Sequence, residues 1–101
     1  MKKIYFVATF RDYDNSPVYC GLKGGRTVGY FETLEEAKQC VEENWGDIYE
    51  DGYYKYAVIE GAEPGLYPTC LDAKFYKWKD GSYKRIRRPK KLKNICNFTI
   101  G

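Results

Sequence analysis

Histidine is missing from all 101 residues of the sequence. Because histidine is the usual general base and the commonest zinc ligand, its absence excludes Ser-His-Asp and Cys-His catalytic sites. Carboxylates, tyrosines and cysteines remain, and the one cysteine beside a basic run, Cys96, lies in an apolar segment that favours burial over reactivity. We therefore expect a protein that is not an enzyme and has no catalytic residue.

Closely spaced cysteines are missing as well. Intervals of 20, 30 and 26 residues separate Cys20, Cys40, Cys70 and Cys96. A structural zinc site takes its ligands in close pairs, so this spacing predicts no metal site, and no motif calls for a cofactor. The apolar stretch at 4–10 is too short for a signal peptide and lacks a cleavage site. These features favour a cytoplasmic protein with reduced, mostly buried thiols.

Long apolar runs are also absent. No stretch approaches the roughly 18 consecutive apolar residues of a membrane span, so we expect no membrane partner. The length predicts a single domain over residues 1–101, with one modest core. An aromatic content of 18% provides enough apolar surface for a folded chain rather than a disordered one.

Charge is plentiful but unevenly distributed. Residues 1–73 carry 7 basic and 13 acidic side chains, a net charge of −6. Residues 74–101 carry 10 basic and 1 acidic side chain, a net charge of +9. The overall value of +3 therefore conceals a bipolar chain.

The N-terminal third is predicted to be a β meander. Apolar and β-branched residues alternate over 3–10, which is typical of a strand near the middle of a sheet. The segment 11–17 is rich in turn formers, and Val18–Leu22 is the expected hairpin partner of the first strand. A glycine-rich turn at 23–26 and a further strand at 27–31 complete the meander.

One amphipathic helix is predicted over residues 33–46. Thr33 and Glu36 form a capping box, and Gly46 is a plausible stop signal. Apolar residues recur at spacings of three and four, namely Leu34, Ala37, Val41, Trp45 and Ile48, with Cys40 beside them. Such a stripe needs a sheet to cover.

Further strands are predicted after the helix. They comprise 52–61, a hairpin of 74–79 and 82–86 joined by Asp80-Gly81, and 95–100, with a helical turn at 89–93. The resulting fold class is α+β: a small antiparallel sheet with one helix packed on one face, in the order ββ(β)αβββ(β).

A basic, aromatic-rich run near the C-terminus is the sharpest candidate site. Its cations are Lys77, Lys79, Lys84, Arg85, Arg87, Arg88, Lys90, Lys91 and Lys93. Tyr76, Trp78 and Tyr83 are interleaved with them, and cations that neutralise phosphates together with aromatics that stack on bases are typical of single-strand nucleic-acid binding. Two alternatives are a solvated hairpin edge protected by lysines, and attraction to an acidic partner or to the acidic half of the chain.

The predicted helix carries a complementary acidic surface, formed by Glu35, Glu36, Glu42 and Glu43. Regularly spaced carboxylates on a helix can imitate phosphates and occupy a basic groove of a nucleic-acid-handling protein. The alternative is an ordinary solvated helix face.

Several segments together resemble a family of small uncharacterised proteins of clostridial-type Gram-positive bacteria, their phages and mobile elements. The segments are Val28–Ala37, Tyr56–Glu60, Gly65–Pro68, Phe75–Trp78 and Asn97-Phe98. The resemblance covers nearly the whole chain but implies no catalytic or binding residue. It implies a setting in which small proteins inhibit bacterial defence, CRISPR effectors included.

These observations lead to two functional hypotheses. The first is a non-enzymatic cytoplasmic protein that inhibits bacterial defence, in the manner of an anti-CRISPR protein, by electrostatic blocking of a bacterial protein or ribonucleoprotein surface. The alternative is direct binding of single-stranded RNA or DNA by the basic aromatic hairpin.

Overall fold

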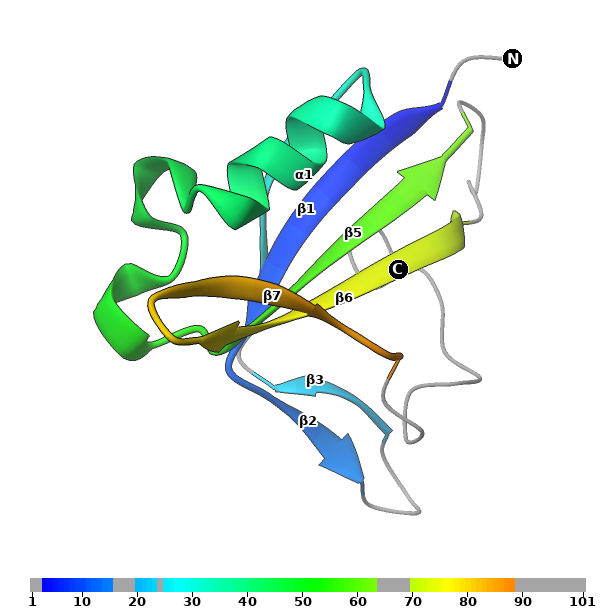
Figure 1. The fold of residues 1–101 in the computed structure, drawn as a ribbon. Helices are drawn as coiled ribbons and strands as arrows, with labels where there is room; N and C mark the ends of the chain where they lie inside the picture. The colour runs from blue at the N-terminus through cyan, green and yellow to red at the C-terminus, as the bar shows by residue number, and fades with distance from the viewer. Residues whose placement is uncertain (1–2, 16–19, 24, 64–69, 89–101) are drawn as a thin grey trace.

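A computed structural model describes residues 3–15, 20–23, 25–63 and 70–88 of the protein. Five strands form one antiparallel sheet in the order β4-β1-β5-β6-β7, with helix α1 (Leu34–Glu42) packed on one face (Figure 1). The strands are β1 (Ile4–Phe10), β4 (Arg26–Phe31), β5 (Tyr56–Ala62), β6 (Cys70–Lys79) and β7 (Ser82–Ile86). The predicted α+β fold, an antiparallel sheet with one helix on one face, is confirmed.

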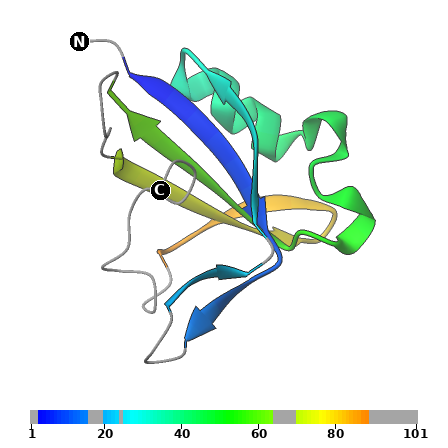
Figure 2. The same cartoon turned by 180° about the vertical axis from the view of Figure 1, so that it is seen from behind.

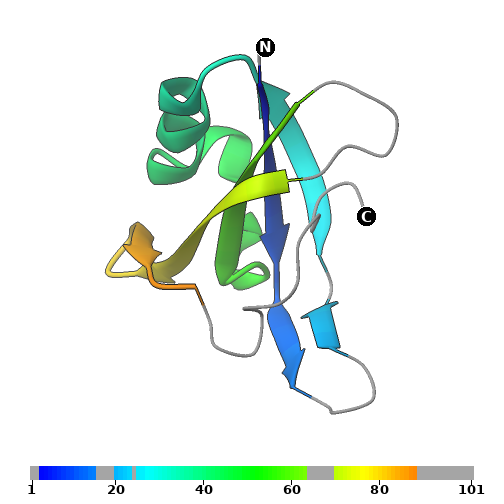
Figure 3. The ribbon, with the colours of Figure 1, turned by 90° about the vertical axis from the view of Figure 1, so that its right-hand side faces the viewer.

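Strand β1 lies inside the sheet, between β4 and β5 (Figure 2). The prediction that Val18–Leu22 pairs with it is wrong. β3 (Cys20–Lys23) pairs instead with β2 (Asp12–Asn15) in a separate two-stranded sheet at one end of the molecule (Figure 3).

The physical reason is that β1 with β2, and β3 with β4, form the two arms of one long hairpin whose pairing is interrupted between the two sheets. Thr9 pairs with Arg26 and Asp12 pairs with Lys23, so the β2–β3 pair continues the register of the β1–β4 pair. The segment 11–17 was expected to be a loop, but its residues Asp12–Asn15 form β2, which extends the first strand. Lys23 and Arg26, the ends of the expected turn at 23–26, belong to β3 and β4.

The start of α1 agrees with the predicted capping box. The backbone N–H of Glu36 donates to Thr33 Oγ1 at 3.2 Å, and the Thr33 hydroxyl donates to Glu36 Oε1 at 3.0 Å. The first bond satisfies the Glu36 amide, which has no partner within the helix, and in the second the Glu36 side chain reaches back to the Thr33 hydroxyl. Ala37, Cys40 and Val41 form the buried stripe of the helix, as expected.

The helix ends at Glu42, earlier than the predicted residue 46. Asn44 and Gly46 adopt left-handed backbone conformations, with φ of 52° and 60°, and such residues terminate a right-handed helix. Two short 3₁₀ turns follow, η1 (Trp45–Asp47) and η2 (Glu50–Gly52). Trp45 therefore leaves the apolar stripe and is 38% exposed.

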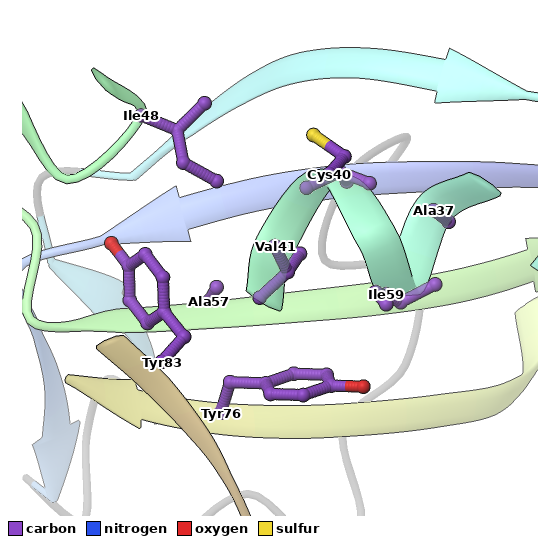
Figure 4. Packing of buried hydrophobic residues seen from close by; sticks show 9 residues of the cluster. Ala37, Cys40, Val41, Ile48, Ala57, Ile59, Tyr76 and Tyr83 are labelled. Carbon is purple, nitrogen blue, oxygen red and sulfur yellow. The ribbon is translucent and has the colours of Figure 1, made fainter. Parts of the chain in front are cut away.

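Both faces of the sheet are apolar. On the helix side, Ala57, Ile59, Tyr76 and Tyr83 pack with Val41 of α1 in the larger core cluster (Figure 4). On the opposite side, alternate residues form a second buried cluster, which comprises Ala8, Phe10, Val58 and Phe75. An apolar sheet with two buried faces is what the near-continuous apolar pattern of β1 predicts.

The later strands differ from the prediction mainly at their ends. β5 begins at Tyr56 rather than at residue 52, because η2 occupies the residues before it. β6 begins at Cys70, four residues before the predicted start at residue 74. The predicted helical turn at 89–93 and the last strand at 95–100 lie outside the described residues. Within the described ranges, no helix has the length and apolar character needed to cross a membrane.

Candidate binding surface on the β6–β7 hairpin

The β6–β7 hairpin forms where the sequence predicts it. Asp80 and Gly81 both have positive φ, 53° and 85°, as the two central residues of a type I′ turn require. This turn matches the twist of the flanking strands and sets the register, in which Lys79 pairs with Ser82 and Lys77 with Lys84. The Asp-Gly hairpin prediction is thus confirmed.

Three lysines share the face of this hairpin that points away from α1. Cross-strand partners lie on the same face of a sheet, and residues two apart do so as well. Lys77 therefore lies directly opposite Lys84, and Lys79 lies on the same face. All three side chains are exposed. We call Lys77, Lys79 and Lys84 the lysine strip.

The lysine strip is not neutralised by acidic neighbours. In the part of the chain that the structure describes, no ion pair involves any of its three side chains. The ammonium of Lys77 lies 5.8 Å from the centre of the Tyr56 ring, a cation–π contact that leaves the positive charge in place. The strip thus presents net positive charge to an approaching partner.

The arginines of the predicted basic run are distributed over different surfaces. Arg85 pairs with Tyr76 and so lies on the helix side, whereas the Arg88 guanidinium lies 5.5 Å from the Phe75 ring centre on the opposite side. Arg87 is exposed beyond the end of β7, and Lys90, Lys91 and Lys93 lie outside the described residues. The described part of the run is therefore divided between two faces of the sheet.

The aromatic residues of the hairpin are buried or partly buried. Tyr76 and Tyr83 are 1% and 2% exposed, and Trp78 stacks on Tyr49 with ring centres 3.7 Å apart. Stacking on nucleic-acid bases needs an exposed ring face, which Tyr76 and Tyr83 do not offer, while Trp78 is partly buried with one face covered by Tyr49. The reason is strand alternation: Tyr76 and Trp78 alternate with Lys77 and Lys79, which places rings and lysines on opposite faces.

These rings instead attach the hairpin to the segment after α1. The Tyr83 hydroxyl donates to the Tyr54 carbonyl at 2.6 Å, and the Tyr83 ring meets that of Trp78 edge-on at 5.1 Å. Tyr49 completes the cluster by stacking on Trp78. Burial raises the pKa of Tyr83, with smaller contributions from Tyr49 and Asp47, so its hydroxyl stays protonated as the hydrogen bond requires.

The buried tyrosines predict a loss of stability in alkali. Burial raises the pKa of Tyr76 and of Tyr83 above the usual 10.0, and the charge of Glu42 raises that of Tyr76 further while Arg85 lowers it. The unfolded chain releases these protons first, so their contribution is complete below pH 10.0 and declines above it. Urea unfolding at increasing pH should show this decline, and Tyr83→Phe should make it shallower. An equal decline in Tyr83→Phe would contradict the assignment.

The predicted acidic residues form a separate surface along α1. Glu35, Glu36, Glu42 and Glu43 are all exposed. Glu43 accepts hydrogen bonds from Trp45 Nε1 at 3.0 Å and from Gln39 Nε2 at 2.9 Å, and these bonds lower its pKa. The acidic and basic surfaces are thus carried by different elements.

Chemical groups for metal binding or covalent catalysis are scarce in the described residues. Among them, no group of three or more histidine, cysteine, aspartate or glutamate residues is placed to hold a metal ion. Cys40 is a free thiol in the core, and burial raises its pKa, which keeps it protonated. Cys96 lies outside the described residues.

Sequence reasoning missed one surface, a groove beside the edge strand β4. It is lined by Arg26, Thr27, Val28, Trp45, Gly46 and Ile48. The helix ends early, and Trp45 is turned outward to form one wall of the groove. The sequence signal for this turn is the presence of Asn44 and Gly46, two residue types that readily adopt positive φ.

The chain matches no protein-family model, no curated protein and no solved structure in comparisons with all three.

Proposed function

We propose that the protein is a non-enzymatic binding protein whose lysine strip covers an anionic surface of a bacterial protein or ribonucleoprotein complex. The carrying observation is the direct pairing of Lys77 with Lys84 on one exposed face. Like charges directly opposite one another destabilise an antiparallel pair by roughly 0.2–1 kcal/mol. An anionic partner would relieve this repulsion. The Lys77–Lys84 pair therefore lowers the stability of the unbound protein and favours binding of an anion.

Protection of a sheet edge does not account for the whole strip. Lysines on an edge strand discourage pairing with other chains, and β7 is an edge strand among the described strands. That purpose explains Lys84, but Lys77 lies on the inner part of β6, where its partners are Tyr56 of β5 and Lys84 of β7. The exposure of Lys77 on an inner strand favours a binding role.

A surface of fixed anions fits the strip better than a free single strand does. Tyr76 and Tyr83 are buried, and Trp78 lies on the face of the hairpin opposite the lysine strip, so the strip can neutralise phosphates but has no hairpin ring beside it to stack on splayed bases. Phosphates held in a ribonucleoprotein, or carboxylates on a protein surface, need only that charge.

The biological role that we propose is inhibition of a bacterial defence effector in the cytoplasm. This role rests on the family resemblance of the sequence, whereas the binding surface rests on the hairpin. The inhibitor would act by occupying an anionic surface that the effector needs exposed.

A cleavage assay with a purified, guide-loaded CRISPR effector tests the proposal. We expect the full chain to bind the loaded effector and to slow cleavage of its target, more strongly at about 0.05 M than at about 0.2 M salt. A labelled single-stranded oligonucleotide serves as the comparison and should bind more weakly. Unchanged cleavage together with tighter oligonucleotide binding would contradict the proposal and favour direct nucleic-acid binding.

A further inference from the structure

The two edges of the sheet are protected differently. The edge strand β7 carries Lys84 and Arg85, whereas the stretch 27–31 of β4 carries no charged side chain. Among the described strands β4 pairs only with β1, so over residues 28–31 alternate N–H and C=O groups point away from that partner. Tyr30 on this strand is 68% exposed. The β4 edge is therefore suited to pairing with another strand.

A groove runs beside this edge. It has a volume of about 410 Å³ and lies between β4 and η1, with Val28 on the strand side and Trp45 and Ile48 on the other. The lining residues Val28 of β4 and Trp45 of η1 place these two segments on either side of the groove. Trp45 is fixed as a wall, because its ring meets Phe31 edge-on at 5.9 Å and its Nε1 donates to Glu43.

The surroundings of the groove are acidic. Residues 32–53 carry eight acidic side chains and one basic side chain, a net charge of −7. Arg26, the cation in the groove lining, forms an ion pair with Glu50, while Glu43 and Asp47 are exposed beside Trp45. Charge complementarity therefore favours a basic occupant.

We propose that the β4 edge and this groove bind an extended, basic segment of a partner protein, which adds to the sheet as a sixth strand. Main-chain hydrogen bonds to β4 would provide affinity, and pockets for alternate side chains would provide specificity. Every second side chain of the segment, small and apolar, would pack against Trp45 and Ile48, and flanking lysines or arginines would meet the acidic rim. This surface is separate from the lysine strip, so the inference goes beyond the proposed function.

A defined peptide tests this inference. The probe is a fluorescein-labelled peptide of about nine residues, long enough for one strand, with alternating valine and threonine and two lysines at each end. We expect the full chain to bind it and to protect backbone amides of 28–31 from hydrogen exchange. A central proline removes a main-chain donor and should weaken binding by about tenfold.

Three controls separate strand addition from general attraction. Trp45→Ala removes the groove wall and should weaken binding, with circular dichroism to show that the fold persists. Lys79→Glu/Lys84→Glu should bind the peptide as the natural chain does, which separates this inference from the proposed function. Glutamates in place of the terminal lysines of the peptide should abolish binding.

Several results would overturn the inference. The inference is wrong if the peptide does not bind, or if the proline peptide binds equally well. Binding without protection of the β4 amides would indicate attraction to the acidic helix alone and would also overturn it.

Sedimentation velocity provides one more contradicting result. A dimer of the chain that the peptide dissociates would show that a second copy, not a partner segment, occupies the β4 edge.

Discussion

Replacing Tyr83 with alanine is expected to lower the free energy of unfolding by about 3–5 kcal/mol, the range for removing a large buried ring. Tyr83 is fully enclosed by the core, and its ring contacts those of Tyr49 and Trp78. It also supports the Tyr54 carbonyl through its hydroxyl. The substitution therefore removes packing and a buried hydrogen bond together, and urea unfolding followed by circular dichroism measures the loss.

The conservative variant Tyr83→Phe separates these two contributions. It keeps the ring but leaves the Tyr54 carbonyl without its partner, which should cost about 1–3 kcal/mol. Equal losses in both variants would show that the ring contributes nothing beyond its hydroxyl. Losses below about 1 kcal/mol in both would contradict the placement of Tyr83 in the core.

The second large effect is expected from reversing charge on the lysine strip. Lys79→Glu/Lys84→Glu should weaken binding to the anionic partner by about 100-fold. The same change should leave stability unchanged or raise it by roughly 0.2–1 kcal/mol, because Glu at position 84 then faces Lys77 across the strands. Weaker binding by a fold that is no less stable distinguishes a binding surface from a structural one.

A matched control keeps net charge out of the comparison. Arg11→Glu/Lys55→Glu changes the net charge of the protein by the same amount, and both residues are exposed. Arg11 lies over the Tyr53 ring, and the Lys55 carbonyl accepts a hydrogen bond from the backbone N–H of Trp78. Neither residue belongs to the strip. Binding by this control should remain close to that of the natural chain.

Local signals in the sequence predicted most of the fold. The capping box at Thr33, the apolar stripe of α1 and the Asp80-Gly81 turn each specify a local geometry, and the structure contains all three. Strand pairing was less predictable, because the partner of β1 depends on contacts distant in sequence. The pairing of β2 with β3 was missed because the turn-forming residues Asp12–Asn15 adopt an extended conformation.

The candidate site was likewise predictable from local sequence features only in part. The charge imbalance placed a basic surface on the β6–β7 hairpin, and its exposed lysines lie there. Composition alone treated Tyr76 and Lys77 as members of one patch, whereas strand alternation places neighbours in sequence on opposite faces. The groove at Trp45 was missed because a periodic apolar pattern does not reveal where left-handed residues end a helix.

The salt dependence of binding tests the role of the lysine strip most directly. The affinity of the full chain for a guide-loaded CRISPR effector would be measured by biolayer interferometry between about 0.05 M and about 0.2 M salt. Binding should weaken linearly on logarithmic axes, and Lys79→Glu/Lys84→Glu should reduce the slope by about 1.4–1.8, since each lost phosphate contact accounts for roughly 0.7–0.9. Arg11→Glu/Lys55→Glu should preserve the slope. The same slope in all three proteins, or an equal reduction in both variants, would contradict a binding role for the strip.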